Sequence, residues 1–164
     1  MAFPPNQYLT YELDSQIIQL FDAISSKSAD SSALEKIGVF FDFIDINLNF
    51  YEGNSDELNF GRMQKTNTAE ETFYYEYSDC EDLGVLLFRF IQYTTKLPCI
   101  LIYYKGHVNI GIAFGKKQKG YSIKFLDNHY TIVDPSFGTI GKKYKKRMLA
   151  IFPYNFKASI LFLK

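Results

Sequence analysis

The sequence predicts an α+β fold in which helices from the N-terminal half pack on an antiparallel β-sheet from the C-terminal half. Before residue 97, apolar residues recur three and four positions apart, which is the spacing of one buried helix face. After residue 97 they form short continuous runs or alternate with polar residues, as in β-strands. The chain has 164 residues and is 47% hydrophobic, enough to bury a core without disulfides. We therefore expect a single domain spanning residues 1–164.

Residues that favour helix N-termini mark the first two helices. Two early prolines predict an extended lead-in over residues 1–12, after which Asp14 is the expected cap of the first helix. Ser32 followed by Glu35 forms the capping box of the second. The apolar positions of the two helices are Ile17, Ile18, Phe21 and Ile24, and then Ile37, Phe40, Phe41, Ile44 and Leu48.

Residues 51–76 are of mixed polar composition with glycines, so we expect a long connection there. This connection reaches the cysteine that follows, and Tyr74, Tyr75 and Tyr77 add aromatic rings with polar tips. Two interpretations stay open. The tyrosines form a wall of a substrate cleft, or they cover the next helix.

Cys80 opens the most regular helical pattern of the chain. The apolar residues that follow it on one helix face are Leu83, Leu86, Leu87 and Phe90. Cys80 lies on the same face, so its sulfur should point inward. A first-turn cysteine meets unpaired N–H groups and the positive end of the helix dipole, which favour the thiolate. Because three flanking carboxylates oppose this by raising the thiol pKa, a cationic partner is required.

The C-terminal half predicts strands at residues 97–104, 107–114, 121–126 and 129–134, with turns at Lys105-Gly106 and Asp127-Asn128. The segment 141–164 should extend the sheet, and MLAIFPY and ASILFL are read as closing strands or as a strand and a short turn, with a break at Pro153. Residues 107–114 alternate between an apolar face and a face of small or polar residues that begins with His107. We expect the Cys80 helix to approach the small-residue face, because close approach would bring the thiol to His107.

His107 begins one predicted strand and Asp134 ends another. In chain order, Cys80, His107 and Asp134 supply a thiol, an imidazole to take its proton and a carboxylate to orient the imidazole. Protonated imidazole is also the required cation. The pattern predicts an acyl-transfer site with these three catalytic residues.

The contexts of these residues resemble a known family. The sequence resembles bacterial transglutaminase-like domains in three motifs, which are DCEDL at the start of a helix, GHV at the start of a strand and VDPS at the end of a strand. TAEETFYYEYSDCED resembles, more narrowly, members of the Bacteroidetes type. The resemblance covers roughly residues 30–140. It implies the papain-like cysteine-enzyme fold, with the nucleophile helix packed on an antiparallel sheet.

The resemblance also implies a role for each residue. Cys80 would be the nucleophile, His107 the general base and acid, and Asp134 the group that holds the imidazole, while the N–H of Cys80 contributes to the oxyanion hole. A second oxyanion donor, often Gln or Trp in papain-like enzymes, has no clear match. Tyr75 or Tyr77 is a positional guess for it.

A topology follows from the same resemblance. In a simple meander of the strands at 107–114, 121–126 and 129–134, the first and third run parallel, and His107 and Asp134 lie at opposite ends of the sheet. The resemblance implies instead that residues 129–134 return antiparallel beside 107–114. Residues 115–128 are then an excursion.

Two functions are consistent with these residues. The first is hydrolysis of a peptide or amide bond in a peptide or protein substrate through an acyl-enzyme, which the family implies over transamidation. The alternative is a catalytically inactive transglutaminase-like binding module of a larger surface or assembly protein. Neither requires a cofactor.

The net charge is zero, but the charges are unevenly distributed. Residues 1–82 hold sixteen acids and four bases, a charge of −12, and residues 83–164 hold two acids and fourteen bases, a charge of +12. The simpler interpretation is that the halves fold against each other, and the alternative is a basic face for an anionic ligand. The basic segment Gly141 to Arg147 could meet phosphates, a membrane surface or the acidic N-terminal half, and a solvated face is the simpler expectation. Motifs that read nucleic acid are absent.

Other sites are not predicted. With two cysteines and two histidines, no cluster has zinc-like spacing, and His129 at a turn is expected to be exposed. Cys99 lies in an apolar run and should be a buried small side chain. No membrane span or export signal is predicted, although a processed fragment of an exported protein would look the same. Compartment and oligomeric state stay open.

Overall fold

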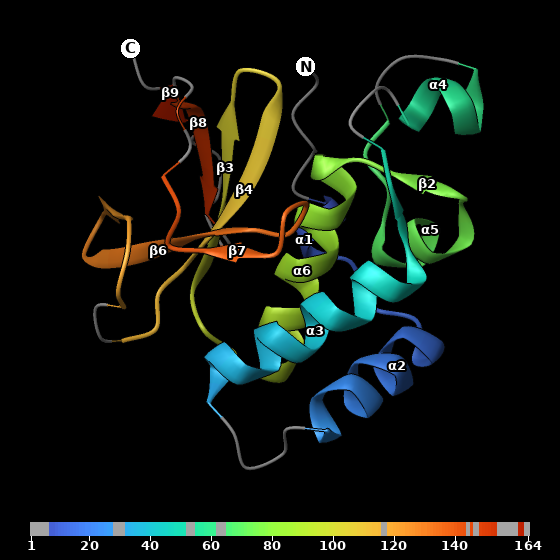
Figure 1. Cartoon of the computed structure of the whole chain (residues 1–164), viewed down its shortest axis with the longest axis horizontal. Helices are drawn as coiled ribbons and strands as arrows, with labels where there is room; N and C mark the ends of the chain where they lie inside the picture. Colours follow the sequence, from blue (N-terminus) through green and yellow to red (C-terminus); the bar gives the residue numbers. More distant parts are fainter. Residues whose placement is uncertain are drawn as a thin grey trace.

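Helices lie on one side of the molecule and a large antiparallel sheet on the other (Figure 1). The computed structural model of the chain describes residues 7–27, 32–51, 55–61, 65–115, 118–143, 145, 148–153 and 161–162. The helices come from the first 94 residues and the strands of the large sheet from residue 99 onward. The predicted α+β class is confirmed.

Caps fix the starts of the long helices, which are α2 (Ser15–Ser26), α3 (Ala33–Asn47) and α6 (Cys80–Thr94). The side chain of Asp14 accepts a hydrogen bond from the N–H of Gln16. Ser32 and Glu35 form a reciprocal capping box, in which each side chain accepts from the other residue's N–H. The predicted starts of α2 and α3 are confirmed.

The lead-in is not extended throughout, because it contains the short helix α1 (Gln7–Thr10). Residues 1–6 lie outside the described residues. A tertiary contact explains the difference: Arg89 of α6 donates hydrogen bonds to the carbonyl oxygens of Leu9 and Tyr11. Arg89 is buried, and its guanidinium lies 4.7 Å from the centre of the Tyr11 ring. Local propensity does not reveal such a contact.

The prediction of a long connection over residues 51–76 is also wrong, since the segment contains α4 (Ser55–Phe60) and α5 (Ala69–Tyr74). Thr68 and Glu71 form a second capping box at the start of α5. The segment is bracketed by a short parallel pair, β1 (Asn49–Phe50) with β2 (Tyr77–Ser78). Tyr74 is 82% exposed and packs on Tyr75, with ring centres 5.2 Å apart.

Helix α6 is buried on all sides from residue 83 to residue 91, because it lies between the other helices and the sheet (Figure 1). Phe90 stacks on Phe40 of α3 with ring centres 4.4 Å apart and meets Phe21 of α2 edge-on at 5.3 Å. The predicted apolar face is therefore correct but covers only part of the buried surface.

The large sheet has the order β5-β6-β4-β3-β8-β9, with β7 paired to β6. Its strands are β3 (Cys99–Tyr104), β4 (His107–Ile112), β5 (Ser122–Phe125), β6 (Asn128–Asp134), β7 (Thr139–Ile140), β8 (Met148–Pro153) and β9 (Leu161–Phe162). All of its pairings are antiparallel. Strand β8 pairs with β3, so the chain ends on the edge opposite β5 (Figure 1).

Strand β6 returns antiparallel beside β4 and lies between β4 and β5. Ile110 pairs with Val133 and Ile112 with Thr131. This is the expected arrangement, and it brings the start of β4 near the end of β6. The turn before β6 falls one residue earlier than predicted, at Leu126 and Asp127.

Helix α6 packs on the apolar face of β4, not on the small-residue face as predicted. Val108, Ile110 and Ile112 belong to the same core cluster as the buried face of α6. Close packing is permitted by Gly84, where a Cβ would stand 3.3 Å from Cγ1 of Val108. On the other face, Gly111 makes room for side chains of β3 and β6.

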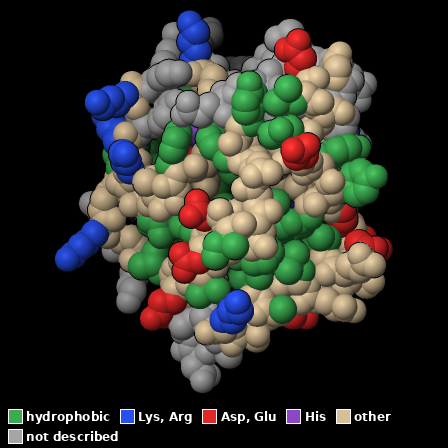
Figure 2. Space-filling model, turned by 45° about the vertical axis from the view of Figure 1, so that its right-hand side comes forward, with side chains coloured by type: hydrophobic (Ala, Val, Ile, Leu, Met, Phe, Trp, Pro, Cys, Tyr) green, Lys and Arg blue, Asp and Glu red, His purple; other side chains and the backbone are tan. Residues whose placement is uncertain are grey.

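The charge division along the chain is visible on the surface. On the face in Figure 2, acidic side chains spread over the centre and right, and most basic side chains lie at the left and top. Of the basic segment, residues 144, 146 and 147 lie outside the described residues, and Lys142, Lys143 and Lys145 are exposed. Within the described ranges, no helix is long and apolar enough to cross a membrane.

Candidate active site

Cys80 is the first residue of α6, half-buried and packed against the main core. Its side chain is a free thiol, as is that of Cys99, which is 2% exposed. The two cysteines do not form a bridge that would block the thiol. The prediction of Cys99 as a buried small side chain is confirmed.

Sheet register explains what meets the Cys80 sulfur. The N–H of Ala113 donates to the carbonyl oxygen of Pro98. Because hydrogen-bonding direction alternates along a strand, the backbone groups of odd-numbered β4 residues face β3. The N–H of Val108, an even-numbered residue, therefore points to the other edge of the strand. The described pairing of β4 with β6 begins at Ile110, so it does not include Val108. The Val108 N–H instead donates a hydrogen bond to the sulfur of Cys80. The thiol therefore lies at the edge of β4, one residue along from His107.

The environment of Cys80 favours the neutral thiol. Burial, followed by the negative charge of Asp79, raises the pKa of the Cys80 thiol to about 12, and the Val108 N–H opposes this rise. Glu81 and Asp134 raise the pKa further. The N-terminus of α6 alone does not yield a thiolate, in agreement with the requirement for a cation.

His107 and Asp134 form a buried pair. Nε2 of His107 lies 2.7 Å from Oδ2 of Asp134, and the two residues are 5% and 6% exposed. We assign the proton to Nε2 because Oδ2 of a carboxylate can only accept. The carboxylate thus fixes the orientation of the imidazole, and Nδ1 is the other ring nitrogen.

Two further residues hold this pair, and the sequence did not single them out. Asn109 is 1% exposed, and its amide nitrogen lies 2.9 Å from Nε2 of His107 and 3.0 Å from Oδ2 of Asp134. Because Nε2 carries the proton, the amide donates to Oδ2. The N–H of Ser136 donates to Oδ1 at 3.1 Å. The signal for Asn109 was its position two residues after His107, on the same strand face.

The N-cap of α6 lies directly before Cys80. The side chain of Asp79 accepts from the N–H groups of Glu81 and Asp82. The tyrosine guess for a second donor finds no support at Tyr77, whose hydroxyl donates to Glu76; this bond raises the pKa of Tyr77.

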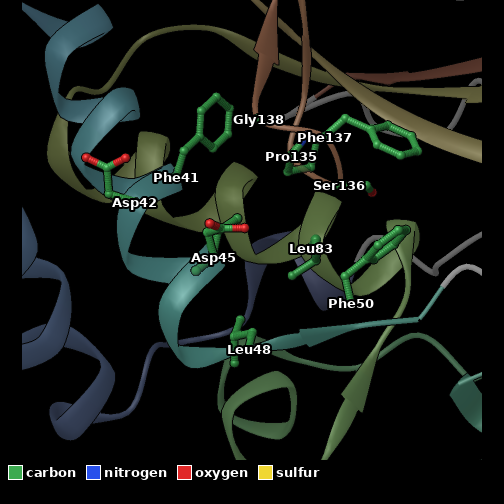
Figure 3. A pocket seen from close by; sticks show the side chains of 11 residues that line it. Phe41, Asp42, Asp45, Leu48, Phe50, Leu83, Pro135, Ser136, Phe137 and Gly138 are labelled. Atoms are coloured by element: carbon green, nitrogen blue, oxygen red, sulfur yellow. The ribbon is translucent and has the colours of Figure 1, made fainter.

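A cavity of about 290 Å³ lies between α3 and the residues that follow β6 (Figure 3). Residues 135–138, which directly follow Asp134, form one wall, and Phe41, Leu48, Phe50 and Leu83 form apolar walls. Figure 3 shows Ser136 between the rings of Phe137 and Phe50, whose centres are 5.9 Å apart. The Oγ of Ser136 is buried and has no hydrogen-bond partner within the described residues.

Phe137 is the most exposed aromatic residue at the site. Its ring centre lies 5.9 Å from that of His107, and the side chain is 53% exposed. His129, by contrast, is exposed on β6 opposite Lys124, as predicted. No group of three metal-ligating side chains occurs in the described part of the chain.

Comparison with family models, with curated proteins and with solved structures finds no match to this chain. The transglutaminase-like resemblance of the sequence therefore remains a prediction, and function has to be argued from the geometry of the site.

Proposed function

We propose that the chain is a cysteine-dependent acyl-transfer enzyme of transglutaminase-like, papain-like fold that hydrolyses a peptide or amide bond. The observation that supports this most is the buried hydrogen bond between His107 and Asp134, one residue from the N–H that faces the Cys80 thiol. Removing an imidazole and a carboxylate from water is costly. A buried imidazole held by a carboxylate is the arrangement of a general base, and the backbone N–H of the next residue, Val108, meets the thiol that it would serve.

In the proposed reaction, Nδ1 of His107 takes the Cys80 proton as the sulfur attacks the carbonyl carbon. Asp134 stabilises the imidazolium through Nε2, and the N–H of Cys80 binds the oxyanion. The C–N bond breaks as the imidazolium protonates the leaving amine, and a thioester forms on Cys80. His107 then deprotonates a water molecule that hydrolyses the thioester, which releases a carboxylic acid and restores the thiol.

The cavity beside residues 135–138 is suited to a substrate side chain. Its apolar walls can cover an aliphatic or aromatic group, and the Ser136 hydroxyl is a donor without a described partner. Asp42 and Asp45 line the same cavity and favour a positive charge at its rim.

One observation favours the second candidate, a non-catalytic binding module. The raised pKa of Cys80 keeps the thiol neutral near pH 7 unless a cation faces it. A thiol that stays neutral is a poor nucleophile. The two candidates therefore differ in whether His107 activates Cys80.

Acylation by p-nitrophenyl esters of N-acetyl amino acids tests the proposal, because these esters need no knowledge of the natural substrate. We expect one acyl group per chain on Cys80, located by peptide mass spectrometry, followed by deacylation. Both steps should be slower in His107→Ala by a factor on the order of 10²–10⁴. His129→Ala is the matched control and should behave as the parent. Equal rates in the parent and His107→Ala, or no thioester on Cys80 in the parent, would contradict the proposal.

A further inference from the structure

A second cavity, of about 390 Å³, lies against the residues that hold His107. Asn109 and Asp134 form part of its lining, together with Phe137, which also lines the first cavity. Asn109 and Asp134 contact the imidazole of His107 directly. A group bound in this cavity is therefore one residue away from the proposed general base.

The rest of the lining is basic. Lys142, Lys143 and Lys145 contribute three positive charges and Thr139 contributes a hydroxyl. Asp134 is the one acid among the described residues of the lining, which together carry a net charge of +2. Its carboxylate oxygens already accept from His107, Asn109 and Ser136.

These lysines are not neutralised by acids within the described residues. The ion pairs between described residues join Lys65 to Glu71 and His107 to Asp134. The ammonium of Lys143 lies over the ring of Tyr121, 5.4 Å from its centre. Three ammonium groups at one concave site without described partner carboxylates favour an anionic ligand.

We infer that this cavity is an anion subsite, which binds a carboxylate or phosphate of the substrate next to the scissile bond. The inference rests on the proposed function for the identity of the ligand as a substrate. The volume of about 390 Å³ is at the lower end of the range of ligand pockets, about 300–1,000 Å³, and accommodates an acidic side chain. The expected substrate class is an acidic or phosphorylated peptide.

The test measures binding without catalysis, on full-length Cys80→Ser protein. The probes are N-acetyl-Gly-Glu-amide, its phosphoserine counterpart and the neutral N-acetyl-Gly-Gln-amide, titrated while the backbone amide NMR shifts of Asn109 and Thr139 are followed. We expect at least one anionic probe to bind about 10-fold more tightly than the neutral probe, because a charge-assisted contact is worth about that much. Whichever anionic probe binds more tightly identifies the group.

A matched pair of variants localises the effect. K142Q/K143Q/K145Q should remove the preference for anions, and K27Q/K96Q/K124Q, which lowers the net charge equally at exposed lysines elsewhere, should retain it. Equal binding of charged and neutral probes, or equal loss in both variants, would overturn the inference. Anion binding with an unreactive Cys80 would refute the proposed enzyme but keep the subsite, whereas a reactive Cys80 without anion preference would do the reverse.

Discussion

Substitution of Gly111 tests how closely β6 is held against β4. A Cβ at Gly111 would stand 2.7 Å from Cγ1 of Ile100 and 2.9 Å from Cβ of Tyr130, whereas ordinary contacts begin at 3.4 Å. The neighbours must therefore move by 3.4 − 2.7, or 0.7 Å. Because Cβ of Tyr130 is one bond from the backbone, β6 itself has to shift, and Asp134 lies on β6.

We expect Gly111→Ala to lower the free energy of unfolding by about 1–3 kcal/mol, the usual cost of overpacking. For a chain of this size that corresponds to a melting temperature roughly 2–12 °C lower. Thermal and urea unfolding followed by circular dichroism measure both. The control is Gly38→Ala in α3, where a Cβ meets nothing within 4 Å and stability should rise by about 1 kcal/mol. An unchanged stability in Gly111→Ala would refute the packing argument.

Two further predictions concern α6. Asp79→Asn keeps a good N-cap but removes the charge that, after burial, contributes most to the raised thiol pKa, so Cys80 should titrate at lower pH than in the parent. Thiol alkylation against pH measures this, and Asp127→Asn on an exposed turn should leave the titration unchanged. Arg89→Gln removes the charged donor to Leu9 and Tyr11 and should cost about 2–4 kcal/mol in urea unfolding, with partial recovery in Arg89→Lys. A loss below about 0.5 kcal/mol would mean that this contact does not hold the N-terminal segment.

Elements set by local chemistry could be predicted from the sequence. The caps at Asp14 and Ser32 depend on hydrogen bonds within three residues of the chain, and both helices begin there as predicted. Asp79 caps α6 in the same way, although it was not among the predicted caps. The same signal was present at Thr68 and Glu71. It was overlooked because α5 is short and its surroundings are polar.

Features set by packing between distant segments could not be predicted. Helix α6 packs on the apolar face of β4 partly because Gly84 of the helix leaves room for Val108. Gly111 on the opposite face of β4 leaves room for side chains of β3 and β6 instead. The roles of Asn109, Ser136 and Phe137 require the register of β4 with β6. The pairing of His107 with Asp134 was predicted only because the resemblance supplied a strand order that a simple meander does not.

The pH dependence of Cys80 alkylation by iodoacetamide, in the parent and in His107→Ala, tests the central claim most directly. Without a facing cation, a thiol pKa of about 12 leaves a thiolate fraction on the order of 10⁻⁵ at pH 7. We predict that Cys80 of the parent is alkylated readily at or below pH 7 and that His107→Ala loses this reactivity, with Cys99 unreactive in both. Identical profiles in the two proteins would show that His107 does not activate Cys80, and the binding module would then be the better account.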